Sequence, residues 1–322
     1  MLIYLSLTRG QTHARDVLAD DSRRALGFGQ VLAGKPREAL ATLQESAAFA
    51  RQIENLWGEA ECSWKLAYTW LELGDYGKAI GLAREGIQLT DKLGLQPMTS
   101  LALSVWGTVQ RTLMVLDGVR ETFLEELINS EAQHLIEVVL DWILAELCAV
   151  HALAGDWRQA HESARQGLQV RGDESLLPMG LCGWYETEAF LRGGDGDLAR
   201  AEVEQLAGIV GSNRRYQLIL LRSRAVLAQW DGDVVQAIAH LEAALALAQK
   251  IGLPGEEWPI LGALGELYLQ QGNEEMAQEA YQKAATIINR LARTVDDEDL
   301  RAGFFAADPA RSVLEQGEKV LR

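Results

Sequence analysis

The stretch Trp57–Leu93, WGEAECSWKLAYTWLELGDYGKAIGLAREGIQLTDKL, decides the fold. Apolar residues recur at helical spacing from Trp64 onward, stop at Gly74 and Asp75, and resume from Ala79. Gly74 can take the positive φ that ends a helix, and Asp75 can accept hydrogen bonds from the free N–H groups of the next helix. The stretch therefore predicts two amphipathic helices joined by a tight turn.

The same turn recurs along the whole chain. A glycine followed within a few residues by a small or apolar residue marks each instance: Gly34, Gly74, Gly118, Gly155, Gly196, Gly232 and Gly272. The marks lie roughly forty residues apart, and a helical hairpin repeated at a fixed period indicates a solenoid. One hairpin cannot bury its own apolar stripe, so each needs its neighbours. The sequence predicts an all-α solenoid of about seven helical hairpins.

The seventh hairpin carries the fullest motif: Leu264, Gly265, Tyr268, Gly272, Ala277, Tyr281 and Ala284. These residues resemble the pattern of the tetratricopeptide repeat family, although the family period is about thirty-four residues. The resemblance covers roughly residues 22–290. It implies a right-handed α-α superhelix that acts as a scaffold for binding other proteins.

We expect a single solenoid domain over residues 1–322. A partial helix is expected in 1–19, seven hairpins in 20–292, and capping helices in 293–322. Asp20, Asp21 and Ser22 are N-cap candidates for the first hairpin. Asp296 and Asp297 can cap a short closing helix, Glu298 to Ala306, and Pro309 can open another.

The closing segment has a resemblance of its own, carried by Leu300, Arg301, Phe304, Phe305, Val313 and Leu314. It resembles the end of the tetratricopeptide region in large bacterial signal-transduction ATPases and transcriptional regulators. The resemblance implies that the chain is a sensor or docking region of a larger protein.

Composition and charge narrow the classes of function. The formal net charge of −16 argues against a nucleic-acid-binding surface, which needs a basic stripe, and favours a protein or peptide partner with basic segments. No apolar run approaches the roughly 18 residues of a membrane span, so we expect no membrane contact and a cytoplasmic location. Cys62, Cys148 and Cys182 have no paired spacing and are expected to be free buried thiols.

No chemistry-bearing motif stands out. The chain has no phosphate loop and no dinucleotide fingerprint, and the glycine cluster at 193–196 falls in a repeat turn. His151 and His161 lack the further ligands that a zinc site needs. We therefore expect no catalytic residue, no cofactor and no metal, and we interpret the chain as a non-enzyme.

The family resemblance also implies which residues face a partner, because first helices line the concave surface of such superhelices. Counting back from each turn gives the candidates for a concave-groove binding site: Arg24, Phe28, Glu61, Trp64, Tyr68, Trp184, Arg222 and Gln229. Aromatic and Arg side chains dominate this set, as in energetic hot spots of interfaces. Trp70 is expected to be core instead.

Three readings of the function follow. The first is the docking region described above, which binds a peptide or protein in its groove. The second is a stand-alone receptor for a peptide or small molecule, of the quorum-sensing type, which a superhelix closed into a pocket would favour. The third is a self-assembly module that forms a homo-oligomer through an open amino-terminal end at residues 1–19.

Overall fold

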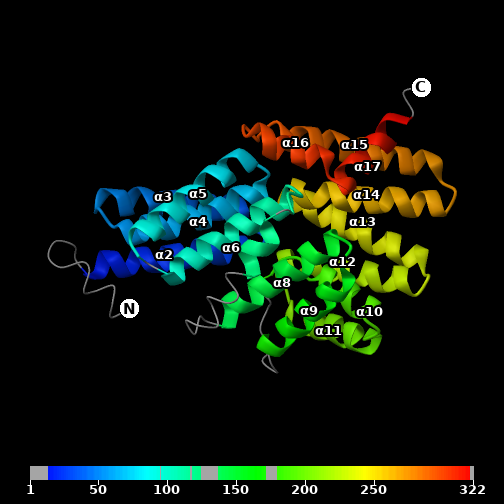
Figure 1. Ribbon diagram of the computed structural model, residues 1–322, viewed down its shortest axis with the longest axis horizontal. Helices are drawn as coiled ribbons and strands as arrows, with labels where there is room; N and C mark the ends of the chain where they lie inside the picture. Colours follow the sequence, from blue (N-terminus) through cyan, green and yellow to red (C-terminus); the bar gives the residue numbers. More distant parts are fainter. Residues whose placement is uncertain (1–13, 95, 117, 125–136, 172–179, 320–322) are drawn as a thin grey trace.

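The computed structural model describes residues 14–94, 96–116, 118–124, 137–171 and 180–319 of the chain. These residues form helices and connecting turns without a strand, arranged as a curved array of antiparallel pairs (Figure 1). The amino-terminal helices are α2 (Ala14–Leu32), α3 (Pro36–Gln52), α4 (Leu56–Leu73), α5 (Tyr76–Lys92) and α6 (Gln96–Thr112). The middle helices are α8 (Glu137–Leu153), α9 (Trp157–Arg171), α10 (Trp184–Arg192) and α11 (Gly196–Ile209). The array ends with α12 (Arg214–Trp230), α13 (Val234–Ile251), α14 (Pro254–Gln270), α15 (Glu274–Ala292), α16 (Glu298–Ala306) and α17 (Asp308–Glu318). The predicted all-α solenoid is confirmed.

The hairpin turns owe their shape to a glycine followed by a capping side chain. Gly74 has a φ of 80°, and the Asp75 carboxylate accepts a hydrogen bond of 3.2 Å from the Lys78 N–H group. Asp233 and Asn273 cap α13 and α15 in the same way. The local chemistry expected for these turns is confirmed.

Two turns differ from those that the sequence pattern suggested. In the fifth hairpin Gly194 takes the positive φ of 87°, whereas Gly196 is the first residue of α11. In the third hairpin the turn is longer than expected: α6 already ends at Thr112, Met114 takes a φ of 58° although it is not a glycine, and Gly118 has a φ of 79° before the next helix begins. The second helix expected after Gly118 falls partly outside the described residues.

The first hairpin also begins earlier than predicted. Asp20, Asp21 and Ser22 lie inside α2, so the N-cap assignment was wrong. Asp20 is fully buried, where its carboxylate accepts hydrogen bonds from Ser46 (2.5 Å) and Arg24. The Asp20 carboxylate therefore binds Ser46 on α3 and Arg24 one turn further along α2, rather than the free N–H groups of the helix end. The prediction for residues 1–13 lies outside the described part of the chain.

The carboxy-terminal helices return to the second hairpin and close the superhelix on itself (Figure 1). The Tyr76 N–H group donates to the Thr294 hydroxyl at 3.0 Å, and Arg84 donates to Asp297 at 3.1 Å. The Phe304 ring on α16 lies 6.2 Å from Tyr76 and 6.1 Å from the Trp258 ring on α14. The concave side is therefore an enclosed interior rather than an open groove.

Asp297 caps α16 through the Leu300 N–H group, as expected. Pro309 stands in the first turn of α17, which packs along α15.

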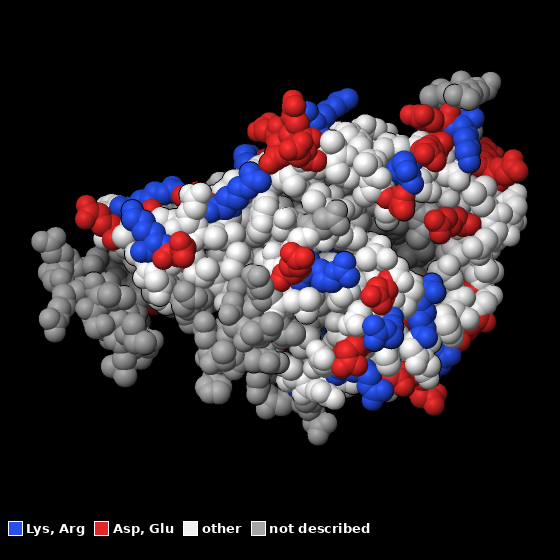
Figure 2. Space-filling model, viewed as in Figure 1, with Lys and Arg blue, Asp and Glu red and all other residues white. Residues whose placement is uncertain are grey.

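The outer surface mixes charges of both signs. Basic and acidic side chains are interspersed on the face shown in Figure 2, without a continuous basic stripe on that face. Helix α13 is long and apolar enough to cross a membrane, judged by length and composition alone. We found no apolar run of this length in the sequence and so overlooked this helix. Here its inner face packs against α12 and α14, with Ala237, Leu241 and Ala244 buried. The opposite face of α13 is exposed, as in an outer helix of a helical array.

Candidate functional site

The interior of the closed superhelix contains a cavity of about 70 Å³, which we call the central cavity. Helices α4, α6, α10, α12 and α14 line it, each the first helix of a hairpin. They contribute Tyr68, Arg111, Trp184, Arg222 and Trp258 respectively. Repetition of one hairpin therefore points the corresponding faces of five helices at a common centre.

A buried ion network forms part of the wall and joins three hairpins. Arg215 donates to Glu72 at 2.7 and 3.2 Å and to Glu256 at 2.7 Å, while Arg222 donates to Glu256 at 2.6 Å. Burial alone would raise the pKa of Glu256, but Arg215 and Arg222 outweigh burial and lower it. Glu256 is thus held as a carboxylate, and α4, α12 and α14 are tied together across the interior.

Aromatic rings supply the apolar part of the wall. The Arg222 guanidinium lies 3.5 Å from the centre of the Trp184 ring, and the Trp184 and Tyr185 ring centres are 5.3 Å apart. Tyr68 meets Trp142 edge to face at 5.5 Å. Desolvated aromatic and Arg groups of this kind carry much of the energy of molecular recognition.

Buried hydrogen-bonding groups without a protein partner occur at the cavity. Among the described atoms, Arg215 Nη1 and the Tyr76 hydroxyl are buried and have no hydrogen-bond partner. Arg215 lines the cavity, whereas Tyr76 does not line it, although its hydroxyl lies close to the wall residue Gly255. Because buried polar groups are normally paired, the unpaired Arg215 Nη1 marks the wall as suited to a ligand with carbonyl or carboxylate oxygens.

The structure brings three of the predicted groove residues together in the central cavity, namely Tyr68, Trp184 and Arg222. Gln229 instead lies near the exposed end of α12, outside the cavity lining. Whether any of them binds a partner stays a prediction.

Four other predicted residues, Arg24, Phe28, Glu61 and Trp64, form a separate cluster between α2 and α4. Arg24 is fully buried and donates to Glu61 at 2.8 Å, and it also pairs with Asp20 and Asp21. Phe28 lies edge-on to Trp64 with ring centres 5.1 Å apart. These side chains contact one another, so they contribute to packing between the first two hairpins.

Two of the three tryptophans of α4, Trp64 and Trp70, have environments that differ from those expected. Trp64 is only 4% exposed and belongs to the core, whereas Trp70 is half-buried and has the Lys78 ammonium 3.9 Å from its ring centre. The assignment of Trp70 to the core was therefore only partly right. The two rings differ in burial because they meet different neighbours. Trp64 packs against Phe28 on α2, whereas Trp70 lies beside Lys78 at the start of α5.

Sequence reasoning missed four charged residues of the wall, Glu72, Arg111, Arg215 and Glu256, and also Glu146, which pairs with Arg111. Arg111 lies on α6 and Glu146 on α8. Counting back from Met114 rather than Gly118 would have found Arg111, but a turn residue other than glycine gives no such signal. The other four have no local signature because each of their partners lies on another hairpin.

The cysteines and the possible metal ligands among the described residues do not form a catalytic or metal-binding cluster. Cys62, Cys148 and Cys182 are free and buried, as predicted, and burial raises the pKa of Cys62 to about 11. Within the described ranges no group of three or more His, Cys, Asp or Glu side chains could hold a metal ion.

Comparison with known proteins agrees with this architecture. Residues 216–290 match the family model for the tetratricopeptide repeat. No curated protein sequence matches the chain.

Solved structures resemble the chain over most of its length at low sequence identity. A Rap protein complexed with competence and sporulation factor has a TM-score of 0.68 and 13% identity, covering 90% of this chain and 80% of that one. The apo form of RapI has a TM-score of 0.60 and 11% identity, covering 84% of this chain and 99% of that one. The Cut9–Hcn1 assembly has a TM-score of 0.57 and 16% identity, and 90% of this chain matches 54% of that chain. Residues 216–290 are therefore tetratricopeptide repeats, within a chain whose described fold is the helical-hairpin solenoid of that repeat class.

Proposed function

We propose that this chain is a non-catalytic receptor that binds a short peptide, or a segment of a partner protein, through the central cavity. The observation that carries the proposal is the closure of the superhelix, which turns the concave surface into an interior with aromatic walls and an unpaired buried donor, Arg215 Nη1. Repeat scaffolds of this class offer their concave face to partners.

The chemistry of the wall defines what part of a peptide would bind. Arg215 Nη1 can donate to backbone or terminal carboxylate oxygens, and Trp184 and Tyr185 can cover an apolar side chain. A cavity of about 70 Å³ accepts one small anchoring group, since complete ligand pockets measure about 300–1,000 Å³. A longer segment would require the second and seventh hairpins to separate.

The comparisons support a receptor in one respect. One protein of similar fold, the Rap protein, is seen in complex with competence and sporulation factor, so a solenoid of this shape can hold a second molecule. The docking region of a larger signalling ATPase stays a prediction based on the closing segment. Self-assembly likewise stays a prediction, because most of the amino-terminal end on which it depends lies outside the described residues.

Selection of a peptide from a displayed library of short random sequences tests the proposal. We expect a selected peptide to bind the wild-type chain and to lose at least about tenfold in affinity, measured by calorimetry, on the change Arg222→Met. The change Gln229→Ala serves as the matched control, because it truncates a polar side chain of the same helix outside the cavity. Circular dichroism of both variants reports whether they remain folded.

The effects of the two variants on peptide affinity show whether the peptide binds in the central cavity or elsewhere. Loss of affinity with Arg222→Met alone supports binding in the central cavity. Loss with Gln229→Ala alone, or failure to select any peptide, contradicts it.

A further inference from the structure

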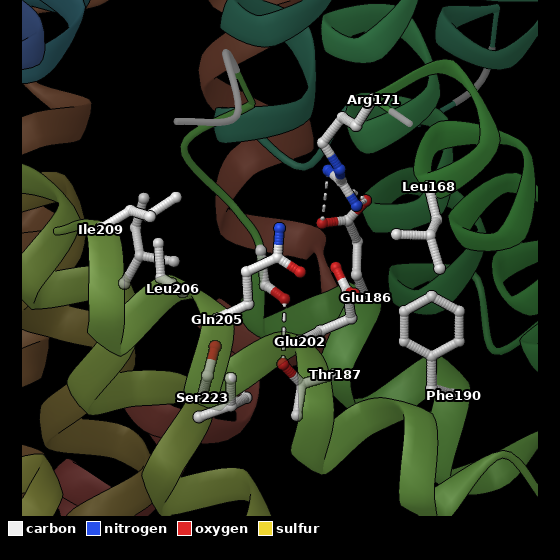
Figure 3. A pocket seen from close by; sticks show the side chains of 13 residues that line it. Leu168, Arg171, Glu186, Thr187, Phe190, Glu202, Gln205, Leu206, Ile209 and Ser223 are labelled. Carbon is white, nitrogen blue, oxygen red and sulfur yellow. Dashed lines mark hydrogen bonds and ion pairs between the residues drawn. The ribbon is translucent and has the colours of Figure 1, made fainter. Parts of the chain in front are cut away.

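A second cavity, of about 60 Å³, lies beside the fifth hairpin, and we call it the outer cavity (Figure 3). It lies next to α10, which has 9 residues, whereas the first helices of other hairpins, such as α4 and α12, have 18 and 17. Helices α9, α11 and α12 enclose the space next to this short helix. The outer and central cavities use different residues of α10: Glu186, Thr187 and Phe190 for the outer one, Trp184 and Tyr185 for the central one.

The outer cavity has apolar sides and polar ends. Figure 3 shows Leu168 and Phe190 along one side and Leu206 and Ile209 along the opposite side. The Arg171–Glu186 pair lies at one end, and Ser223 lies toward the other (Figure 3). A bound group would therefore have a polar head and an apolar stem.

Negative charge exceeds positive charge around this cavity. Arg171 donates to Asp141 at 3.0 Å and to Glu186 at 3.2 Å, and all three side chains are at most 12% exposed. Glu202 is a third carboxylate whose charge acts on Arg171, and it forms no ion pair or hydrogen bond with another described residue. Among the described residues, the carboxylates of Glu186 and Glu202, which line the cavity, and of Asp141, which lies behind Arg171 and outside the lining, thus act on one guanidinium.

Burial makes this excess of negative charge costly. Burial raises the pKa of Glu186 and of Glu202, and the opposing effect of Arg171 does not cancel it for either group. A cation placed in the cavity would offset this cost, since an opposite charge nearby favours the ionised carboxylate.

An unpaired hydroxyl on a buried residue that lines the cavity is a second, independent sign of a ligand. Ser223 is 2% exposed and lines the cavity, yet its hydroxyl has no hydrogen-bond partner within the described part of the chain. Thr187, by contrast, already donates to the Gly183 carbonyl at 3.2 Å. The Ser223 oxygen is free to accept an N–H group that enters the cavity.

We propose that the outer cavity binds an alkylammonium or alkylguanidinium group. The cationic head pairs with Glu202 and donates to Ser223, and the alkyl stem lies between Phe190 and Leu206. Lysine and arginine side chains carry this chemistry, and so do free alkylamines. The net charge of −16 draws such cations toward the chain. The site does not depend on a peptide in the central cavity.

Methyl NMR spectroscopy of the chain labelled at Ile, Leu and Val provides the test. The probe is n-butylammonium, and n-butanol is the neutral control of similar size. We expect saturable shifts of the Leu206, Ile209 and Ile219 methyl signals with n-butylammonium and none with n-butanol. The Leu253 signal, which reports on the central cavity, should not move.

Two matched variants locate the head group. Glu202→Gln removes the proposed partner, and Glu204→Gln makes the same change on the exposed face of the same helix. We expect Glu202→Gln to weaken n-butylammonium binding by roughly tenfold or more, and Glu204→Gln to change it less than about twofold. Equal effects of the two variants, equal response to n-butanol, or shifts that do not saturate would overturn the proposal.

A lysine tripeptide with blocked ends, acetyl-Gly-Lys-Gly-amide, distinguishes the two sources of the group. Tighter binding than n-butylammonium assigns the site to a polypeptide partner. Binding of n-butylammonium alone assigns it to a free amine. Absence of binding by both probes contradicts the proposal and leaves the function of the central cavity unaffected.

Discussion

Trp64 and Trp70 lie six residues apart on α4, and their surroundings differ in kind. Trp64 is 4% exposed between the first two hairpins, whereas Trp70 is half-buried under the Lys78 ammonium. The change Trp64→Ala removes a fully packed ring and should cost about 3–5 kcal/mol of the free energy of unfolding. Trp70→Ala should cost less than half as much, because solvent already reaches that ring and an exposed cation–π contact contributes about 0.5–1 kcal/mol.

Urea denaturation followed by circular dichroism measures both changes. If Trp64→Ala lowered the free energy of unfolding only slightly and weakened the binding of a selected peptide, Trp64 would be a binding residue of the groove rather than a core residue. Helical spacing showed that both rings lie on an apolar helix, but it did not show which neighbour each one meets, because that depends on how α2 and α5 pack against α4.

Glu202 makes the stability of the chain depend on pH. Burial raises its pKa in the folded state above the usual value, so the folded chain binds more protons than the unfolded chain over the interval between the two values. The chain therefore has its full stability at a pH below the pKa of Glu202 in the unfolded state. It loses part of that stability as the pH rises through the higher pKa of Glu202 in the folded state. Glu202→Gln should raise the melting temperature at pH 8 and should have little effect at pH 4.

The comparison requires phosphate buffer, which contains no amine. Glu204→Gln, on the exposed face of α11, should leave the melting temperature nearly unchanged at both values of pH. If the two variants gave the same profile, Glu202 would not be the buried group that carries the effect.

At the scale of helices and turns, the residues with positive φ decide where hairpins end. Glu54, in the turn between α3 and α4, has a φ of 54°. This backbone conformation is unfavourable for residues other than Gly, Asn and Asp. Glu54→Gly should therefore stabilise the chain by roughly 0.5–1 kcal/mol. Glu45→Gly, at an exposed position inside α3, should destabilise it by about 1 kcal/mol. Thermal denaturation of the two variants should show shifts of opposite sign, and shifts of the same sign would contradict the assignment of the turn.

Most elements were predictable because their signals are local. A turn glycine and the capping residue after it, such as Gly74 with Asp75, determine a hairpin within a few residues. The exceptions have physical reasons. Met114 ends the first helix of the third hairpin without a glycine, and in the cluster at 193–196 only Gly194 takes the turn conformation. An error in the turn shifts the face assigned to the whole helix, which is why Arg111 was overlooked.

At the scale of the whole molecule, closure of the superhelix determines what the concave surface can do. The contacts that close it join residues far apart in sequence, such as Glu72 with Arg215 and Tyr76 with Thr294. A repeat pattern fixes the contacts between neighbouring hairpins, whereas the curvature that accumulates over the array depends on small rotations at each interface. The enclosed interior therefore could not be predicted from the motif, although the aromatic residues Tyr68 and Trp184 on its wall could.

The distance between the second hairpin and the segment before α16 tests the central claim, that the solenoid is closed, most directly. Spin labels at Glu85 and Asp296, two exposed positions next to the Arg84–Asp297 pair, report this distance by pulsed electron paramagnetic resonance. The account predicts one narrow population at short distance in the absence of any ligand. A broad population at long distance would show an open superhelix and would contradict both the closed interior and the receptor function proposed for it.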